Sequence, residues 1–241
     1  MSQLHISISA QPIFHLGKFA FTSSMFVSLL TTVFLSTIAY LFYKSRNKKS
    51  GFNLFIRTCI ESLYEFVQTI APQNAAKFFP LFATIFLFVM SASWAGLLPG
   101  METIGLRTAH GFIPFFRGGT ADLNITLGTA IFAVSMVQVF GYKAFGLKYF
   151  KKFINFSNPI NFFVGFLELI SEFAKIMSFS FRLFGNIFAG EVLLAVISFL
   201  LPVLVPLPFI GLEIFVGFIQ ALVFATLTLV FANIATTSNH H

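Results

Sequence analysis

The chain has 241 residues, of which 57% are hydrophobic and only 10% are charged, and its mean hydropathy is +0.88. This composition excludes an ordinary soluble domain and indicates an integral membrane protein, because each spanning helix needs about 20 mostly apolar residues. The net charge of +7 does not indicate a nucleic-acid partner, since eight of the fifteen basic residues form two clusters that each follow an apolar run. The clusters are Lys44, Arg46, Lys48, Lys49 and Lys143, Lys148, Lys151, Lys152. Both are expected on the cytoplasmic side of a membrane.

The first apolar run, residues 20–43, is too long for a signal peptide and has no basic segment of the usual kind before it. It predicts an uncleaved membrane helix, which places His5 and His15 outside as plain loop residues. Residues 52–77 carry Glu61 and Glu65 one helical turn apart among apolar residues. This segment is expected to be an amphipathic helix at the inner surface, with the two glutamates on its solvated face.

Two further spans are predicted over residues 78–98, where Pro80 opens the apolar run, and over residues 122–141. The Gly-rich stretch between them is expected to be an outer loop. It contains Gly118-Gly119, which is no phosphate loop because no Gly-Lys-Ser/Thr follows. Asp122 stands where a helix N-cap is expected. The third span leads back to the second basic cluster. The chain thus crosses the membrane twice between the two clusters, so both lie on the inner side, as the charge rule requires.

The last two predicted helices, residues 160–200 and 209–234, form a long hairpin. A helix of about 40 residues is about 60 Å long, roughly twice the thickness of the hydrocarbon core. The hairpin must therefore break or lie strongly tilted. The predicted fold is one all-α polytopic membrane domain over residues 1–241, with about five long membrane helices and one interfacial amphipathic helix.

Arg182 lies near the middle of this hairpin's first helix, where a charged side chain costs at least about 2.5–3.5 kcal/mol and faces a partner or a water-filled path. At about 100° per residue, Lys175 points within about 20° of Arg182, whereas Glu191 points about 180° away. Glu168 and Asn186 lie within about 40° of the arginine. Small residues leave one side of this helix shallow, as close helix packing prefers: Ser178, Gly185, Ala189 and Gly190. Glu213 and Gln220, seven residues apart, share a face of the second helix.

Residues 180–191, SFRLFGNIFAGE, closely resemble the hallmark of subunit a of F-type ATP synthases. Three further segments resemble other parts of that family in the same order along the chain: GLLPG at 96–100, TADLN at 120–124 and IQALVFA at 219–225. The resemblance implies a stator subunit that works against a rotating ring of c subunits. The ring carboxylates then take up protons through one aqueous half-channel and release them through another.

The resemblance also implies roles for individual residues. Arg182 matches the essential arginine that separates the half-channels and makes the passing ring carboxylate ionise. Asn186 and Gln220 match its polar neighbours, and Glu168 and Lys175 match positions that relatives use on the inner path. Glu191 and Glu213 match the outer half-channel, where relatives often pair a glutamate with a histidine; two glutamates here suggest a shared proton or water. For Asp122 and Arg117 two alternatives stay open: a direct role in proton movement, or a structural role in the outer loop.

The implied partners are the c-ring, subunit b of the peripheral stalk, the remainder of the F-type ATP synthase and the lipid bilayer, with no nucleic acid, cofactor or metal. The subunit is non-catalytic, and ATP chemistry belongs to its partners, since the chain has no phosphate loop and no soluble domain. The lack of a targeting peptide favours a bacterial plasma membrane, with an organelle inner membrane as the alternative. A self-contained transporter would be expected to show paired repeats, and none is found. An anchoring subunit would need no polar row and would tolerate loss of Arg182.

Overall fold

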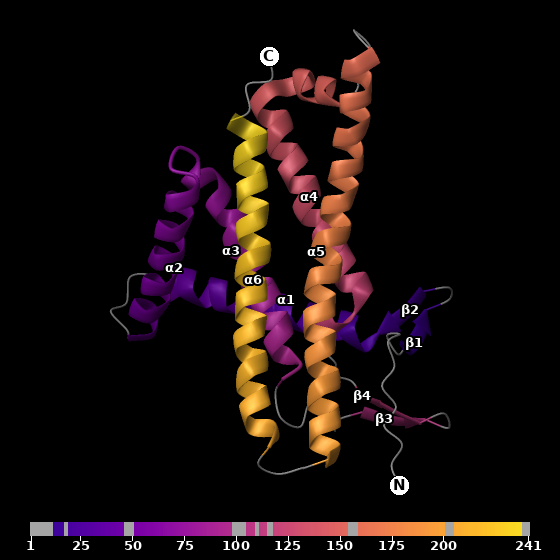
Figure 1. Ribbon diagram of the computed structural model, residues 1–241. Helices are drawn as coiled ribbons and strands as arrows, with labels where there is room; N and C mark the ends of the chain where they lie inside the picture. Colours follow the sequence, from indigo (N-terminus) through magenta and orange to yellow (C-terminus); the bar gives the residue numbers. More distant parts are fainter. Residues whose placement is uncertain are drawn as a thin grey trace.

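Six α-helices account for most of the computed structural model, which describes residues 12–16, 19–45, 51–97, 105–108, 111–114, 118–153, 159–200 and 205–237 (Figure 1). The helices are α1 Ser23–Ser45, α2 Gly51–Ile70, α3 Ala75–Ala95, α4 Leu123–Phe145, α5 Pro159–Leu200 and α6 Pro206–Thr237. Two 3-10 segments, η2 Gly119–Ala121 and η3 Gly146–Lys152, flank α4. All but α2 are long and apolar enough to cross a membrane. The prediction of an all-α polytopic membrane protein is confirmed.

Two short β-hairpins were not predicted. Residues 20–22 of the predicted first span, 20–43, belong to a strand, so the first helix begins at Ser23, and the other three strands lie in segments predicted as loops. β1 Pro12–Leu16 pairs antiparallel with β2 Phe19–Thr22, and β3 Gly105–Thr108 pairs antiparallel with β4 Gly111–Pro114. Strands of four or five residues are too short to show a clear alternation of polar and apolar residues, and glycine begins both β3 and β4. His15 belongs to β1, whereas His5 and Arg117 lie outside the described residues.

The junction between α2 and α3 differs from the sequence prediction. The predicted interfacial helix over 52–77 ends at Ile70, so Lys77 belongs to α3. Pro72 explains the break, because a proline disfavours helical backbone at the residue before it. α3 begins at Ala75, three residues before the predicted span of 78–98, and Pro80 lies inside the helix. Its ring removes only one backbone hydrogen bond, which the second turn of a helix packed on its neighbours tolerates.

The exposed face of α2 carries an ion pair between Arg57 Nε and Glu61 Oε1 at 2.7 Å, with both side chains more than half exposed. The hydrogen bond and the charge of Glu61 raise the pKa of Arg57. An exposed pair at this i, i+4 spacing contributes little to stability. Glu65 is exposed as well, so the described side chains agree with a solvated face for both glutamates.

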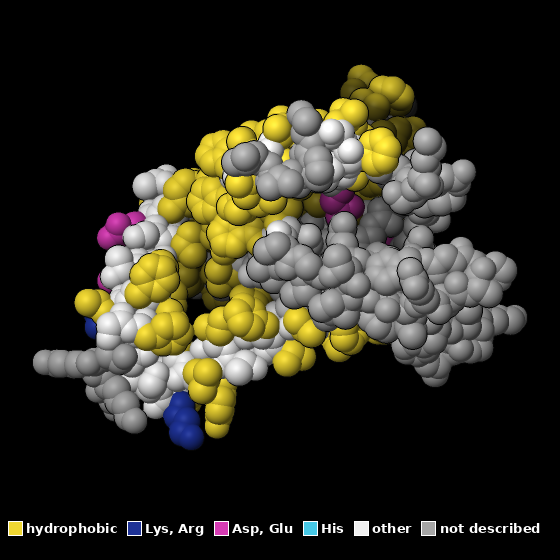
Figure 2. Space-filling model, turned by 90° about the horizontal axis from the view of Figure 1, so that it is seen from below, with side chains coloured by type: hydrophobic (Ala, Val, Ile, Leu, Met, Phe, Trp, Pro, Cys, Tyr) yellow, Lys and Arg dark blue, Asp and Glu magenta, His cyan; other side chains and the backbone are white. Residues whose placement is uncertain are grey.

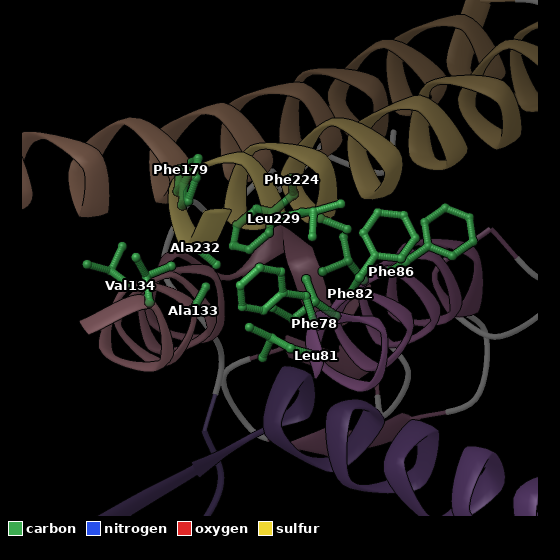
Figure 3. Close-up of a cluster of buried hydrophobic side chains, with 14 of the residues drawn as sticks. Phe78, Leu81, Phe82, Phe86, Ala133, Val134, Phe179, Phe224, Leu229 and Ala232 are labelled. Atoms are coloured by element: carbon green, nitrogen blue, oxygen red, sulfur yellow. The ribbon is translucent and has the colours of Figure 1, made fainter. Parts of the chain in front are cut away.

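The core lies where α3, α4, α5 and α6 meet, and aromatic side chains fill much of it (Figure 3). Phe78, Phe82 and Phe86 recur every four residues along α3 and are almost completely buried. The ring of Phe179 on α5 lies 4.8 Å from that of Phe224 on α6. Each such pair contributes about 0.5–1.5 kcal/mol beyond the burial of its area. These contacts fix the register between α5 and α6.

Hydroxyl groups tie α5 to α4 within this core. Thr126 Oγ1 and Ser180 Oγ lie 3.2 Å apart and are buried. Ser180 stands two residues before Arg182, so the bond holds the central turn of α5 against α4. The opposite side of that turn is thereby left at the surface.

The length of α5 determines how the helices lie in a membrane. Its 42 residues are unbroken and correspond to about 63 Å, whereas α1 with 23 residues is about 35 Å long and matches one bilayer crossing. Figure 1 shows α5 and α6 side by side along their length, with α1 running across them. If α1 stands upright in the bilayer, α5 and α6 are strongly inclined. Hydrophobic side chains cover much of the described surface in Figure 2, as lipid contact requires.

Candidate functional site

Arg182 lies on an exposed face of α5, about midway along the helix. Its Nη2 donates to Ser178 Oγ at 3.3 Å. Among the residues that the structure describes, no carboxylate forms an ion pair with this guanidinium. A permanently charged group on an apolar helix is expected to have a partner. Arg182 is therefore placed to meet an anionic group that approaches from outside the chain.

The surface around Arg182 is shallow. Ser178, Gly185 and Ala189 are exposed on the same side of α5, and a Cβ added at Gly185 would meet nothing within 4 Å. Asn186, one turn after the arginine, is exposed there as well. Small residues at this spacing allow the backbone of another helix to come close. The guanidinium thus lies on a face that a second helix can pass.

One end of the hairpin, here called the outer end because the basic clusters predict it on the outer side, carries a carboxyl group buried between the two helices. Glu213 on α6 is only 5% exposed, and its carboxyl group packs directly against Gly190 on α5. Any Cβ at position 190 would overlap with that carboxyl group. Oε1 of Glu213 has no hydrogen-bond partner among the described residues. Buried oxygens of this kind are satisfied by a proton or by ordered water.

Glu191, the residue after Gly190 on α5, carries a second carboxyl group. Oε1 of Glu191 lies 2.8 Å from the position of a Cβ on Gly118 and 3.8 Å from that of a Cβ on Gly96. Consecutive helix residues point about 100° apart, so Glu191 is directed toward the end of α3 and the η2 segment, whereas Gly190 faces α6. Sharing of a proton or water by Glu191 and Glu213 stays a prediction.

Hydroxyl and indole groups surround this outer end. Ser93 Oγ on α3 and Thr120 Oγ1 on η2 lie 3.1 Å apart and are buried. Trp94 Nε1 donates to the carbonyl oxygen of Ile214 at 3.0 Å, which ties the end of α3 to α6 one residue after Glu213. Ser93 and Thr120 were not predicted as site residues. Thr120 lies in the TADLN segment, but its pairing with Ser93 spans 27 residues and has no local signal.

The opposite end of the hairpin, predicted on the inner side and here called the inner end, carries a carboxylate and an ammonium group in contact. Lys175 Nζ donates to Glu172 Oε1 at 3.0 Å, and the side chains are 23% and 13% exposed. The ammonium also lies 4.8 Å from the ring centroid of Phe231 on α6. Glu168 is half-buried one turn before Glu172. Glu172 was not predicted as a site residue, although its spacing to Glu168 and Lys175 is that of helix neighbours.

Two further candidates have different surroundings. Gln220 on α6 is 9% exposed and lies two turns from Glu213. Asp122 caps α4 as predicted, because its Oδ1 accepts from the backbone N–H of Asn124 at 2.9 Å. This contact gives Asp122 a structural role. Among the described residues, no three His, Cys, Asp or Glu side chains gather into a group that could hold a metal ion.

An all-α polytopic fold with ionisable side chains along two long apolar helices is typical of ion-translocating membrane proteins. The model of the ATP synthase A chain family matches residues 24–233, a range of 210 of the 241 residues that contains every candidate named above except those before residue 24. The chain belongs to this family. It is a proton-channel membrane subunit and part of the ATP synthase complex.

Proposed function

We propose that this chain provides two proton half-channels on either side of Arg182 and couples proton flow to rotation of a c-subunit ring. The observation that carries the proposal is the position of Arg182, exposed on a small-residue face and without a carboxylate partner in the described chain. Carboxyl groups lie along the hairpin on both sides of it, with Glu213 and Glu191 toward the outer end and Glu168 toward the inner end. The exposed face of α5 is the surface that the ring passes.

Arg182 acts through its fixed charge, since a guanidinium does not release its proton. A ring carboxylate about 4 Å away would gain about 4 kcal/mol at an effective dielectric constant near 20. That energy favours the ionised carboxylate by about a thousandfold and drives its proton toward the exit path. The same charge repels a hydrated proton, so the two half-channels do not join at this point.

The carboxyl groups then act as stations for protons. Glu191 and Glu213 pass protons from outer water to the ring, and Glu168 and Lys175 line the path to inner water. Asn186 and Gln220 orient water and the ring carboxylate near the arginine, since amides donate and accept hydrogen bonds without changing charge. Subunit b, the c-ring and a bacterial plasma membrane complete the proposed setting.

The test is Arg182→Ala in the assembled complex. ATP-driven acidification of inverted vesicles is expected to be lost, while passive proton leak after removal of the soluble head persists or rises. Normal pumping with the complex intact would contradict the proposal and would reopen the transporter and anchoring alternatives.

A further inference from the structure

Glu172 and Lys175 form an ion pair that is largely shielded from solvent. Its N–O distance is 3.0 Å, and neither side chain is more than 23% exposed. Lysine in a membrane helix ordinarily extends its ammonium toward the interface. Here the ammonium is held by Glu172 on its own helix and by the Phe231 ring on α6, 4.8 Å away. Ionisable groups in such positions usually serve ion movement.

The direction of Glu172 relates it to the outer carboxyl group. Glu172 precedes Gly190 by 18 residues, which is five full turns at about 3.6 residues per turn, so the two residues lie on the same side of α5. That side faces α6, because Gly190 contacts the carboxyl group of Glu213. The α5–α6 interface therefore carries a carboxyl group at two levels, about 27 Å apart along the helix. Arg182 lies between them.

The charged groups near Glu172 are few in the described chain. On α5, Lys175 contacts it and Glu168 lies one turn away. The single titratable side chain of α6 is Glu213, at the outer end, and those of α4 are Tyr142 and Lys143, at the helix end next to η3. The η3 segment adds a tyrosine and three lysines before α5 begins: Lys148, Tyr149, Lys151 and Lys152. Lys175 is a cation in direct contact with Glu172.

Resting on the proposed function, we infer that Glu172 is a further proton-carrying residue of the inner path. The proton that leaves a ring carboxylate reaches Glu172 through water and binds a carboxylate oxygen, which turns the ion pair into a carboxylic acid beside an ammonium group. The acid then gives the proton to water at the inner side, and the ion pair forms again. In this step only Glu172 gains and loses a proton.

The experiment is Glu172→Gln in the assembled complex, with passive proton flux measured in vesicles after removal of the soluble head. The amide keeps the shape of the side chain but cannot carry a proton, so flux is expected to fall about tenfold or more. Glu172→Asp keeps a carboxylate and is expected to restore most of the flux. The control is Glu61→Gln, which removes a carboxylate from the exposed pair with Arg57 and is expected to leave the flux unchanged.

A purely structural role is tested by the double variant Glu172→Gln, Lys175→Met. If Glu172 only balances the charge of Lys175, removal of both charges restores the flux; our inference is that the flux stays low. Wild-type flux in Glu172→Gln, recovery in the double variant, or equal loss in Glu172→Asp would each overturn the inference. Normal pumping by Arg182→Ala would instead contradict the proposed function itself, so the two failures are distinguishable.

Discussion

The two ends of the α5–α6 hairpin accommodate carboxyl groups in different ways. At the outer end, Glu213 packs against Gly190 and Glu191 packs against Gly118, so a missing Cβ provides the space in each case. At the inner end, Glu172 pairs with Lys175. An uncompensated buried charge is strongly destabilising. At the inner end a cation meets this cost, whereas at the outer end Oε1 of Glu213 has no hydrogen-bond partner among the described residues.

This difference predicts that the outer end is sensitive to added volume and the inner end to removed charge. Gly190 and Lys175 are then the residues on which the two arrangements depend. Substitutions at each end should therefore fail for different reasons, and the predictions that follow are ordered from the largest expected effect to the smallest.

Gly190→Ala is expected to have the largest effect at the outer end. Its methyl group would occupy the position of the Glu213 carboxyl group, and overpacking of this kind costs about 1–3 kcal/mol. The carboxyl group must move, so ATP-driven pumping should fall sharply while the complex still assembles. Pumping by vesicles and the amount of assembled complex are the measurements.

Gly128→Ala on α4 is the matched control, because a Cβ there meets nothing within 4 Å. It should leave pumping unchanged. If Gly190 acts through Glu213, adding Glu213→Gln to Gly190→Ala should reduce pumping by less than the two separate effects predict. Wild-type pumping by Gly190→Ala would show that the close contact has no role in proton movement.

The two outer carboxyl groups should differ in a graded way. Glu213 is 5% exposed, whereas Glu191 is partly exposed, so water can replace the proton transfer of Glu191 more easily. Glu213→Gln should therefore slow pumping more than Glu191→Gln, and neither should stop it as Arg182→Ala does. Initial rates of acidification at matched levels of assembled complex provide the comparison. Equal and mild effects from all three variants would contradict the assignment.

Much of the fold follows from the sequence because span length and charge placement act locally. The apolar runs and the two basic clusters predict the five long helices, and the position of Asp122 predicts its cap on α4. The two β-hairpins are missed because their strands are too short to show a period. The start of α3 at Ala75 could not be read from Pro80, because packing against neighbouring helices tolerates a proline inside a helix.

The candidate site could be predicted only along α5 itself. Helix periodicity relates Arg182 to Lys175 and to Glu191, because all three lie on one helix. The contact between Gly190 and Glu213 depends on the register between α5 and α6, which the Phe179–Phe224 pair and its neighbours set. No local pattern encodes that register. Glu172 is a different case, since the sequence shows its spacing to Lys175 but does not show that its side chain is buried.

The central claim is that two separate water paths meet the hairpin on either side of Arg182. The most direct measurement replaces the exposed Cys59 by serine, introduces a single cysteine at 168 or at 191, and applies a membrane-impermeant thiol reagent from one side of the vesicles at a time. We expect the cysteine at 191 to react from the outer side only and the cysteine at 168 from the inner side only. Reaction of both from the same side, or of neither from any side, would contradict the account.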